Sequence, residues 1–240
     1  MGLPVTRPGR KLARLTLDTL ADLPDDARSC VFWELDPVRR QRAVDAGDAA
    51  SEKEAWLSRV LLEWGSCGRV VYVDGVAAGY VVYAPAPYLP GADALPTAPV
   101  SEDAVLLSTA LVLPEYAGGG LGRMLMQGVV RDVVKRGGIR AVEAFGDTRA
   151  ARPSPADHVS CVLPADYLLR VGFKTQRAHP RYPRMRLEVK SAVTWRSEVE
   201  AALERLLGAV RPGRAASPAT ERLTSEGLET LAPLAPRPPK

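Results

Sequence analysis

The stretch LVLPEYAGGGLGRMLMQ, residues 111–127, runs from an apolar segment through a glycine-rich loop into a helical pattern. Leu121, Leu125 and Val129 recur at the spacing that places side chains on one face of a helix. Glycines allow a backbone to approach an anion closely, and the first N–H groups of a helix have no partner within it. The stretch therefore predicts a phosphate-binding loop where a helix begins.

Two kinds of nucleotide-binding loop can be compared with this glycine spacing. The pattern Gly-x-x-x-x-Gly-Lys-Ser/Thr does not occur in the sequence, which argues against hydrolysis of ATP or GTP by that route. The dinucleotide pattern Gly-x-Gly-x-x-Gly is met at Gly118 and Gly120, but its third position is Arg123. Glu143 follows at a distance where an acidic residue could bind a ribose. A dinucleotide-binding oxidoreductase therefore stays an alternative, although a hairpin rather than a βαβ unit precedes the loop.

The rest of the sequence alternates strand and helix patterns. Residues 69–85 predict a hairpin, because two β-branched and aromatic runs flank Asp74-Gly75. A mostly apolar run at 104–113 predicts a strand that is buried on both faces. Further elements are expected at 12–17, 51–64, 139–145, 161–173, 174–178 and 185–189, with a last helix at 197–207.

Length, composition and charge favour a globular protein. Of the 240 residues, 46% are apolar, so a packed core is expected rather than disorder. The 32 basic residues nearly balance the 28 acidic ones, and the net charge of +4 does not demand a nucleic-acid partner. We expect a flexible lead-in over residues 1–11, one domain over 12–207 and a mostly disordered tail over 208–240.

The cysteines and the hydropathy pattern indicate the compartment. Cys30, Cys67 and Cys161 form no C-x-x-C pair, which favours reduced thiols over disulfides or a zinc site. No apolar run reaches membrane length, and no signal-peptide pattern is present. The sequence therefore predicts a cytoplasmic protein that binds neither a membrane nor a metal. Its composition, rich in Ala, Arg, Gly and Pro, is typical of a bacterium of high GC content.

The glycine loop and a second segment together resemble the GCN5-related N-acetyltransferase (GNAT) family. Residues 117–122, which follow Val-Leu-Pro at 112–114, resemble motif A of that family, and YLLRVGFK at 167–174 resembles motif B. The order of expected elements from about residue 12 to residue 190 also follows the family. The resemblance implies an α/β fold with a mixed, mostly antiparallel twisted sheet that helices flank.

The resemblance also implies an N-acetyltransferase, in which an amine attacks acetyl-CoA directly and takes its acetyl group. The acceptor would be a small molecule or a peptide, no metal would take part, and the enzyme would be a monomer or a homodimer. In the family, the loop holds the pyrophosphate of CoA and the backbone before it pairs with the pantetheine arm. Mapped onto this sequence, those positions are Leu111, Val112, Leu113, Gly118, Gly119, Gly120, Leu121 and Gly122.

Several positions depart from the family's pattern. Ala117 replaces the usual Arg or Gln beside the phosphates, and Arg123 is the candidate for a replacement charge. Cys161 takes the place of the family's Asn and is expected beside the pantetheine arm. Tyr167, the candidate general acid, lies one residue before the family's tyrosine position. These departures leave open a catalytically degenerate module that binds CoA or a protein partner.

The implied chemistry needs a base near the acyl group, because an amine attacks a thioester only when it is deprotonated. The motif A strand carries no acid between Ala104 and Leu113. Glu143, on the next strand, is the leading candidate, since the two strands would splay around the thioester. Glu34 is a weaker candidate, within the acceptor pocket.

Overall fold

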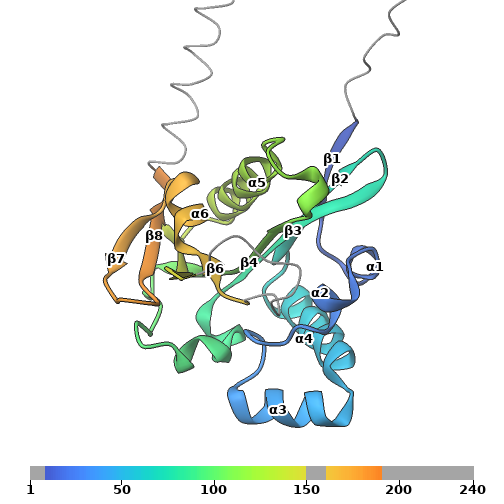
Figure 1. Ribbon diagram of the computed structural model, residues 1–240, viewed down its shortest axis with the longest axis horizontal. Coiled ribbons are helices and arrows are strands. Elements are labelled where there is room, and N and C mark those ends of the chain that lie inside the picture. Colours follow the sequence, from blue (N-terminus) through green and yellow to red (C-terminus); the bar gives the residue numbers. More distant parts are fainter. Residues whose placement is uncertain (1–8, 150–160, 191–240) are drawn as a thin grey trace, which may run out of the picture. The chain divides into compact units, whose positions relative to one another are not determined.

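The computed structural model describes residues 9–149 and 161–190, which form one mixed β-sheet with helices on both faces (Figure 1). Over these residues the strands lie in the order β1-β2-β3-β4-β5-β8-β7, and β6 pairs with β5. β4 and β6 run parallel to β5, whereas all other neighbours in the described sheet are antiparallel, which confirms the predicted fold class. The strands are β1 (Arg10–Arg14), β2 (Gly68–Val73), β3 (Val76–Ala84), β4 (Ala104–Val112), β5 (Ala141–Asp147), β6 (Leu163–Pro164), β7 (Lys174–Arg177) and β8 (Arg184–Glu188).

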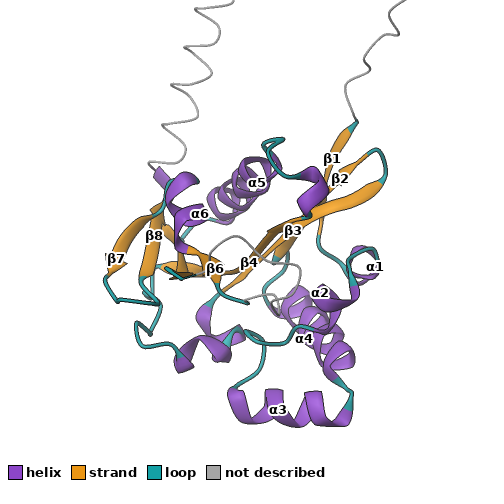
Figure 2. Cartoon of the chain, viewed as in Figure 1, coloured by secondary structure: helices purple, strands orange, loops and turns teal. Residues whose placement is uncertain are grey.

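Helices cover the two faces of the sheet in separate groups (Figures 1 and 2). Successive strand residues point to opposite faces, so Val70 packs in one core with Leu57 of α4, and Val71 packs in the other with Leu125 of α5. α1 to α4 therefore share one face, and α5 and α6 share the other. The helices are α1 (Leu17–Ala21), α2 (Asp25–Ser29), α3 (Pro37–Ala46), α4 (Ala49–Glu63), α5 (Leu121–Arg136) and α6 (Ala165–Arg170).

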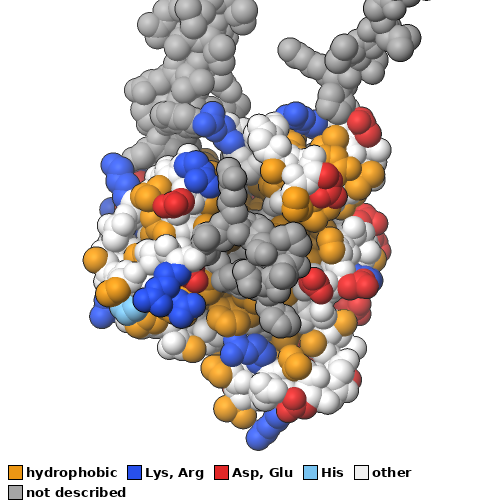
Figure 3. Space-filling view, viewed as in Figure 1, with side chains coloured by type: hydrophobic (Ala, Val, Ile, Leu, Met, Phe, Trp, Pro, Cys, Tyr) orange, Lys and Arg blue, Asp and Glu red, His pale blue; other side chains and the backbone are white. Residues whose placement is uncertain are grey.

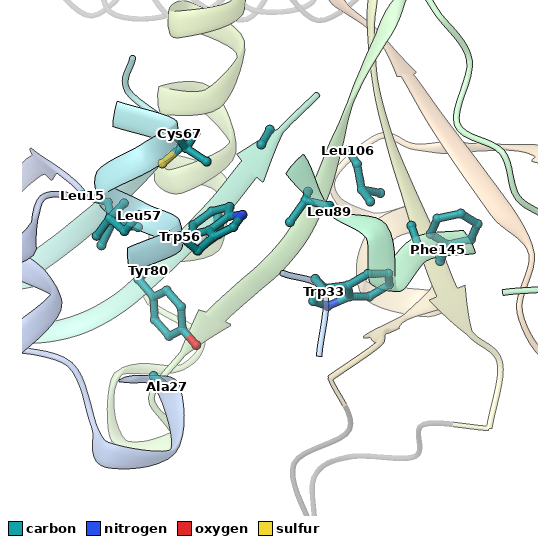
Figure 4. Close-up of a cluster of buried hydrophobic side chains, with 14 of the residues drawn as sticks. Leu15, Ala27, Trp33, Trp56, Leu57, Cys67, Tyr80, Leu89, Leu106 and Phe145 are labelled. Atoms are coloured by element: carbon teal, nitrogen blue, oxygen red, sulfur yellow. The ribbon is translucent and has the colours of Figure 1, made fainter. Parts of the chain in front are cut away.

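The core on the α1–α4 face contains large aromatic side chains (Figure 4). The Trp33 ring stacks on Phe145 of β5, with ring centroids 6.0 Å apart. Trp56 of α4 donates a hydrogen bond to the Tyr88 carbonyl at 2.7 Å. This bond holds the segment after β3, which contains two short 3-10 turns, Ala86–Tyr88 and Pro90–Ala94.

Most of the expected strands and helices are present, but the expected start of the first strand is corrected. The hairpin around Asp74-Gly75 is confirmed, with positive φ angles of 49° and 86° at its two turn residues. β1 begins at Arg10, which pairs with Val73, so residues 10 and 11 belong to the sheet rather than to a flexible lead-in. The expected helix at 197–207 and the expected tail at 208–240 lie outside the described residues.

Both signs of charge appear on the face of the molecule in Figure 3. None of the described helices combines the length and the hydropathy that crossing a membrane requires.

Candidate functional site

β4 separates from β5 after the first three of its nine residues, and this opening defines the candidate site. β3 pairs with β4 from Gly79 to Ala84, whereas β5 pairs with β4 only over Ala104–Leu106. No strand of the described sheet pairs with that edge of β4 beyond Leu106. The end of β4 from Thr109 onward is only half-buried. An extended ligand could therefore add to this edge by backbone hydrogen bonds.

The predicted pantetheine positions lie at this end of β4. Leu111 and Val112 are its last two residues and pair with β3 on the opposite edge. Leu113 differs, because its N–H donates to the Ala78 carbonyl at 2.9 Å and its carbonyl accepts from Tyr116 N at 2.9 Å. The Leu113 N–H is thus already engaged with β3, and Val112, whose backbone groups point to the edge away from β3, is the better candidate for ligand pairing.

The glycine loop forms an open anion-binding geometry at the start of α5. Gly118 and Gly120 have φ angles of +78° and +80°, a conformation that favours glycine. Gly120 precedes the helix, and no side chain of the described residues caps it. No atom of the described residues lies within 4 Å of where a Cβ would stand at Gly118 or Gly120. The N–H groups of Leu121 and Gly122, at the start of α5, have no acceptor inside the helix.

Arg10 brings a cation to this loop from the edge strand β1. Its Nη1 donates a hydrogen bond to the Gly119 carbonyl at 2.8 Å, and its side chain is exposed. Arg123, the residue expected from the sequence to supply a charge, is exposed on the first turn of α5. Arg10 could not be found from local patterns, because 109 residues separate it from Gly119.

Tyr167 lies against the first turn of α5, so two predicted parts of the site meet. A Cβ on Gly122 would stand 3.4 Å from the Tyr167 hydroxyl and 3.3 Å from its ring. Burial raises the pKa of Tyr167 to about 12. The phenol therefore keeps its proton at neutral pH and can donate it.

Glu143 occupies the last paired position before β4 and β5 separate, opposite Leu106. Its side chain is fully buried. One carboxylate oxygen accepts from Arg186 Nη1 at 3.1 Å, and the other accepts from Ser101 N at 3.1 Å and lies 3.5 Å from Arg184 Nη1. These donors surround both carboxylate oxygens, as expected for a residue that holds strands together. A substrate amine would have to displace the donors to reach Glu143.

Comparison with known protein families identifies the family of this chain. The sequence pattern described as "Acetyltransferase (GNAT) family" matches residues 17–153. The chain belongs to this family. No curated protein sequence matches the chain.

Several solved structures are similar to this GNAT chain. One is a GNAT-family protein from Desulfovibrio desulfuricans, with 22% identity, a TM-score of 0.45, and coverage of 75% of this chain and 99% of that one. Another is PaiA N-acetyltransferase from Thermoplasma acidophilum in complex with coenzyme A, with 12% identity, a TM-score of 0.49 and the same coverage. A third is the ribosomal-protein-S18-alanine N-acetyltransferase of Escherichia coli, with 12% identity, a TM-score of 0.43 and coverage of 75% and 94%.

On the α1–α4 face of this GNAT chain, Cys161 contacts Cys30 at the end of α2. The two Sγ atoms are 3.2 Å apart. Trp33 Nε1 donates to the Cys161 carbonyl at 2.8 Å, so Cys161 is tied to the core that contains Phe145 of β5. The structure thus brings Cys161 together with Cys30 at the end of α2 and with Trp33 in the following turn.

A pocket of about 180 Å³ lies on the same face, beside α3 and α4. Glu34 is 2% exposed and forms an ion pair with Lys53 at 2.5 Å, while its Oε2 has no hydrogen-bond partner among the described residues. The carboxylate and guanidinium groups around the pocket give it both signs of charge. Its lining residues are Glu34, Leu35, Arg39, Glu52, Ala55, Trp56 and Arg59.

Within the described residues, no group of three or more His, Cys, Asp or Glu side chains is placed to hold a metal ion.

Proposed function

We propose that this GNAT-family chain transfers the acetyl group of acetyl-CoA to the amine of a small molecule or a peptide. The observation that carries the proposal is the uncapped start of α5, which a short loop joins to the end of β4. On its β5 side, this end of β4 pairs with no strand of the described sheet. An anionic group at the helix start and an extended arm along the strand would then be neighbouring parts of one ligand. Acetyl-CoA, with a pyrophosphate and a pantetheine arm, has that composition.

The loop would hold the pyrophosphate through backbone N–H groups, and the Arg10 guanidinium would add a positive charge beside them. Val112 would pair with the pantetheine arm along the free edge of β4. The loop residues in this role are Gly118, Gly119, Gly120, Leu121 and Gly122, followed on the first helical turn by Arg123.

The reaction would be a direct displacement at the thioester. The amine nitrogen forms a bond to the carbonyl carbon and gives up a proton to water, and the carbon–sulfur bond then breaks with the electron pair leaving on sulfur. A backbone N–H of β4 would stabilise the negative charge on the carbonyl oxygen. Tyr167 would donate its proton to the departing thiolate, since its phenol stays protonated at neutral pH.

Calorimetry with acetyl-CoA and a thiol-release assay together test this proposal. We expect acetyl-CoA to bind at micromolar concentrations, and thiol release to depend on an amine from a panel of polyamines, amino acids and peptides. Absence of binding at high micromolar acetyl-CoA would reject the proposal. Binding without thiol release from any acceptor would instead support a second candidate, a CoA-binding module without catalysis, which the enclosed position of Glu143 favours.

A further inference from the structure

Two of the three thiols in the sequence face each other across a long sequence separation. Cys30 and Cys161 are 131 residues apart, yet their Sγ atoms are 3.2 Å apart. Both residues are partly exposed, so a small oxidant can reach them. The third thiol, Cys67, is fully buried in the core shown in Figure 4.

The surroundings of the pair make the two sulfurs chemically unequal. A hydrogen bond joins the two sulfurs, and with Cys161 as its donor this bond lowers the pKa of Cys30 to about 6, with help from the Phe32 N–H and the charge of Lys53 and against the effect of burial. The same hydrogen bond and burial raise the pKa of Cys161. Cys30 is therefore the sulfur that more readily becomes a thiolate, which is the reactive form of cysteine, and Cys161 is the thiol beside it.

Each cysteine is held in place by its backbone. The Cys30 N–H donates to the Asp26 carbonyl at 3.0 Å, and the Cys30 carbonyl accepts from Lys53 Nζ at 2.9 Å. The Cys161 carbonyl accepts from Trp33 Nε1. These bonds keep the two sulfurs close, so that a shift of about 1 Å would bring them to the bonding distance of about 2.05 Å.

We propose that Cys30 and Cys161 form a redox-active dithiol, which a peroxide converts into an intramolecular disulfide between the end of α2 and the segment that enters β6. The Cys30 thiolate attacks one oxygen of the peroxide, the O–O bond breaks and hydroxide leaves, giving a sulfenic acid. The Cys161 sulfur then attacks the Cys30 sulfur, the S–O bond breaks, and hydroxide leaves with the thiol proton as water. Two thiols and one hydrogen peroxide thus give one disulfide and two waters.

The dithiol is independent of acetyl transfer, because only the cysteines and their neighbours take part in its oxidation. By contrast, burial raises the pKa of Cys67 to about 12, so that Cys67 should stay a thiol under the same treatment. The three cysteines lie in three different tryptic peptides, since arginines separate them. Their oxidation states can therefore be read independently.

The test is equimolar hydrogen peroxide on the reduced full chain at neutral pH, followed by mass spectrometry of a non-reducing tryptic digest. We expect a Cys30–Cys161 linked peptide in most molecules, a chain mass that falls by two hydrogens, reversal by dithiothreitol, and unmodified Cys67. A disulfide that contains Cys67, a disulfide only between chains, or no disulfide would overturn the proposal.

Two substitutions at Cys161 separate its two roles. Cys161→Ser keeps a hydrogen-bond donor for Cys30 but removes the second sulfur, so peroxide should leave a Cys30 sulfenic acid that dimedone traps. Cys161→Ala removes the donor as well, so the midpoint pH of Cys30 alkylation should rise from near 6 toward the ordinary value of about 8.5.

The other ionisable groups that act on the pair are Lys53, Glu34, Tyr80 and Arg40, and both variants retain them. A comparison of the two variants therefore isolates the donor at position 161. Equal midpoints in the two variants would show that Cys161 does not activate Cys30, and would overturn the assigned roles.

Discussion

Arg10 supplies a positive charge to a glycine loop in which Ala117 stands where the family usually has Arg or Gln. The guanidinium reaches the loop from another strand and donates to the Gly119 carbonyl. A cation at this place can attract an anionic ligand without belonging to the loop's own sequence. A family motif that looks incomplete along the chain can thus be completed in space.

Replacing Arg10 with Ala should weaken acetyl-CoA binding about threefold to tenfold at low salt, because one exposed charge-assisted hydrogen bond is lost. Calorimetry at low salt measures the effect, which should shrink at high salt as screening increases. Arg14→Ala is the matched control, since Arg14 is an exposed arginine on the same face of β1. Equal affinities of the two variants would contradict the role of Arg10.

Gly120→Ala should weaken acetyl-CoA binding roughly tenfold, which corresponds to about 1.4 kcal/mol. The backbone at Gly120 is left-handed, with φ 80° and ψ 8°, so a side chain there costs about 1–2 kcal/mol of folding free energy and strains the loop.

Gly47→Ala provides a close control for that measurement. Gly47, at the end of α3, has φ 76° and ψ 13°, and no described atom lies within 4 Å of where its Cβ would stand, as at Gly120. Both variants should lose similar stability in urea unfolding, and only Gly120→Ala should lose affinity. A similar loss of affinity in both would show that the loop conformation is not what binds the ligand.

At the scale of elements, a charged network joins β8 to β5 and to the residue before β4. Arg186 of β8 bonds Glu143 of β5 at 3.1 Å and Asp103, just before β4, at 2.9 Å through each of two nitrogens. Arg184 adds a second positive charge beside Glu143. The network holds the strands together immediately before the point where β4 and β5 separate, and so fixes where the opening begins.

Glu143→Gln should therefore lower the free energy of unfolding by about 2–3 kcal/mol, because two partly buried arginines each lose one charged partner. Urea unfolding measures this, with Glu188→Gln as a control, since Glu188 bonds the same Arg186 but is half-exposed. If Glu143 is instead the catalytic base, Gln should keep the stability and lower kcat at least about 100-fold.

Asp103 should make this network sensitive to acid. The Arg186 hydrogen bonds lower the pKa of Asp103 below its usual 3.8. A carboxylate with a lowered folded-state pKa stabilises the fold above its unfolded pKa, and this contribution is lost as the pH falls through the folded value. Between about pH 5 and pH 3, unfolding free energy should fall less steeply in Asp103→Asn than in the natural chain. Asp93→Asn, at an exposed site before β4, should keep the natural slope.

At the scale of the whole molecule, the sheet divides the core into two. The α5 side carries the glycine loop and Tyr167, whereas the α1–α4 side carries Trp33, Glu34 and the thiol pair. A ligand that binds along β4 between them stabilises the folded state as a whole, because the unfolded chain has no such site.

Acetyl-CoA at one hundred times its Kd should stabilise the fold by about 2.7 kcal/mol, which corresponds to a rise in Tm of roughly 5–10 °C for a domain of this size. Acetyl-pantetheine, which lacks the pyrophosphate, should give a much smaller rise at the same concentration. Differential scanning fluorimetry compares the two ligands. Equal shifts would mean that the glycine loop contributes nothing to binding.

Local order was readable from the sequence because its causes are local. The Asp74-Gly75 turn, the Gly118–Gly120 loop and the periodic apolar face of α5 each depend on residues within a few positions of one another. The ends of strands were harder to predict where pairing with a distant strand decides them. Arg10 is an example, because its place in β1 depends on Val73 of β2.

The sequence by itself determined that a glycine loop opens a helix after a buried strand, because backbone conformation and side-chain periodicity are encoded over short spans. Only the tertiary structure decided what surrounds that loop and the strand before it. Arg10 meets Gly119 across 109 residues, Cys30 meets Cys161 across 131, and Arg186 meets Glu143 across 43. These contacts depend on the order of strands in the sheet, which brings together side chains that no local spacing relates.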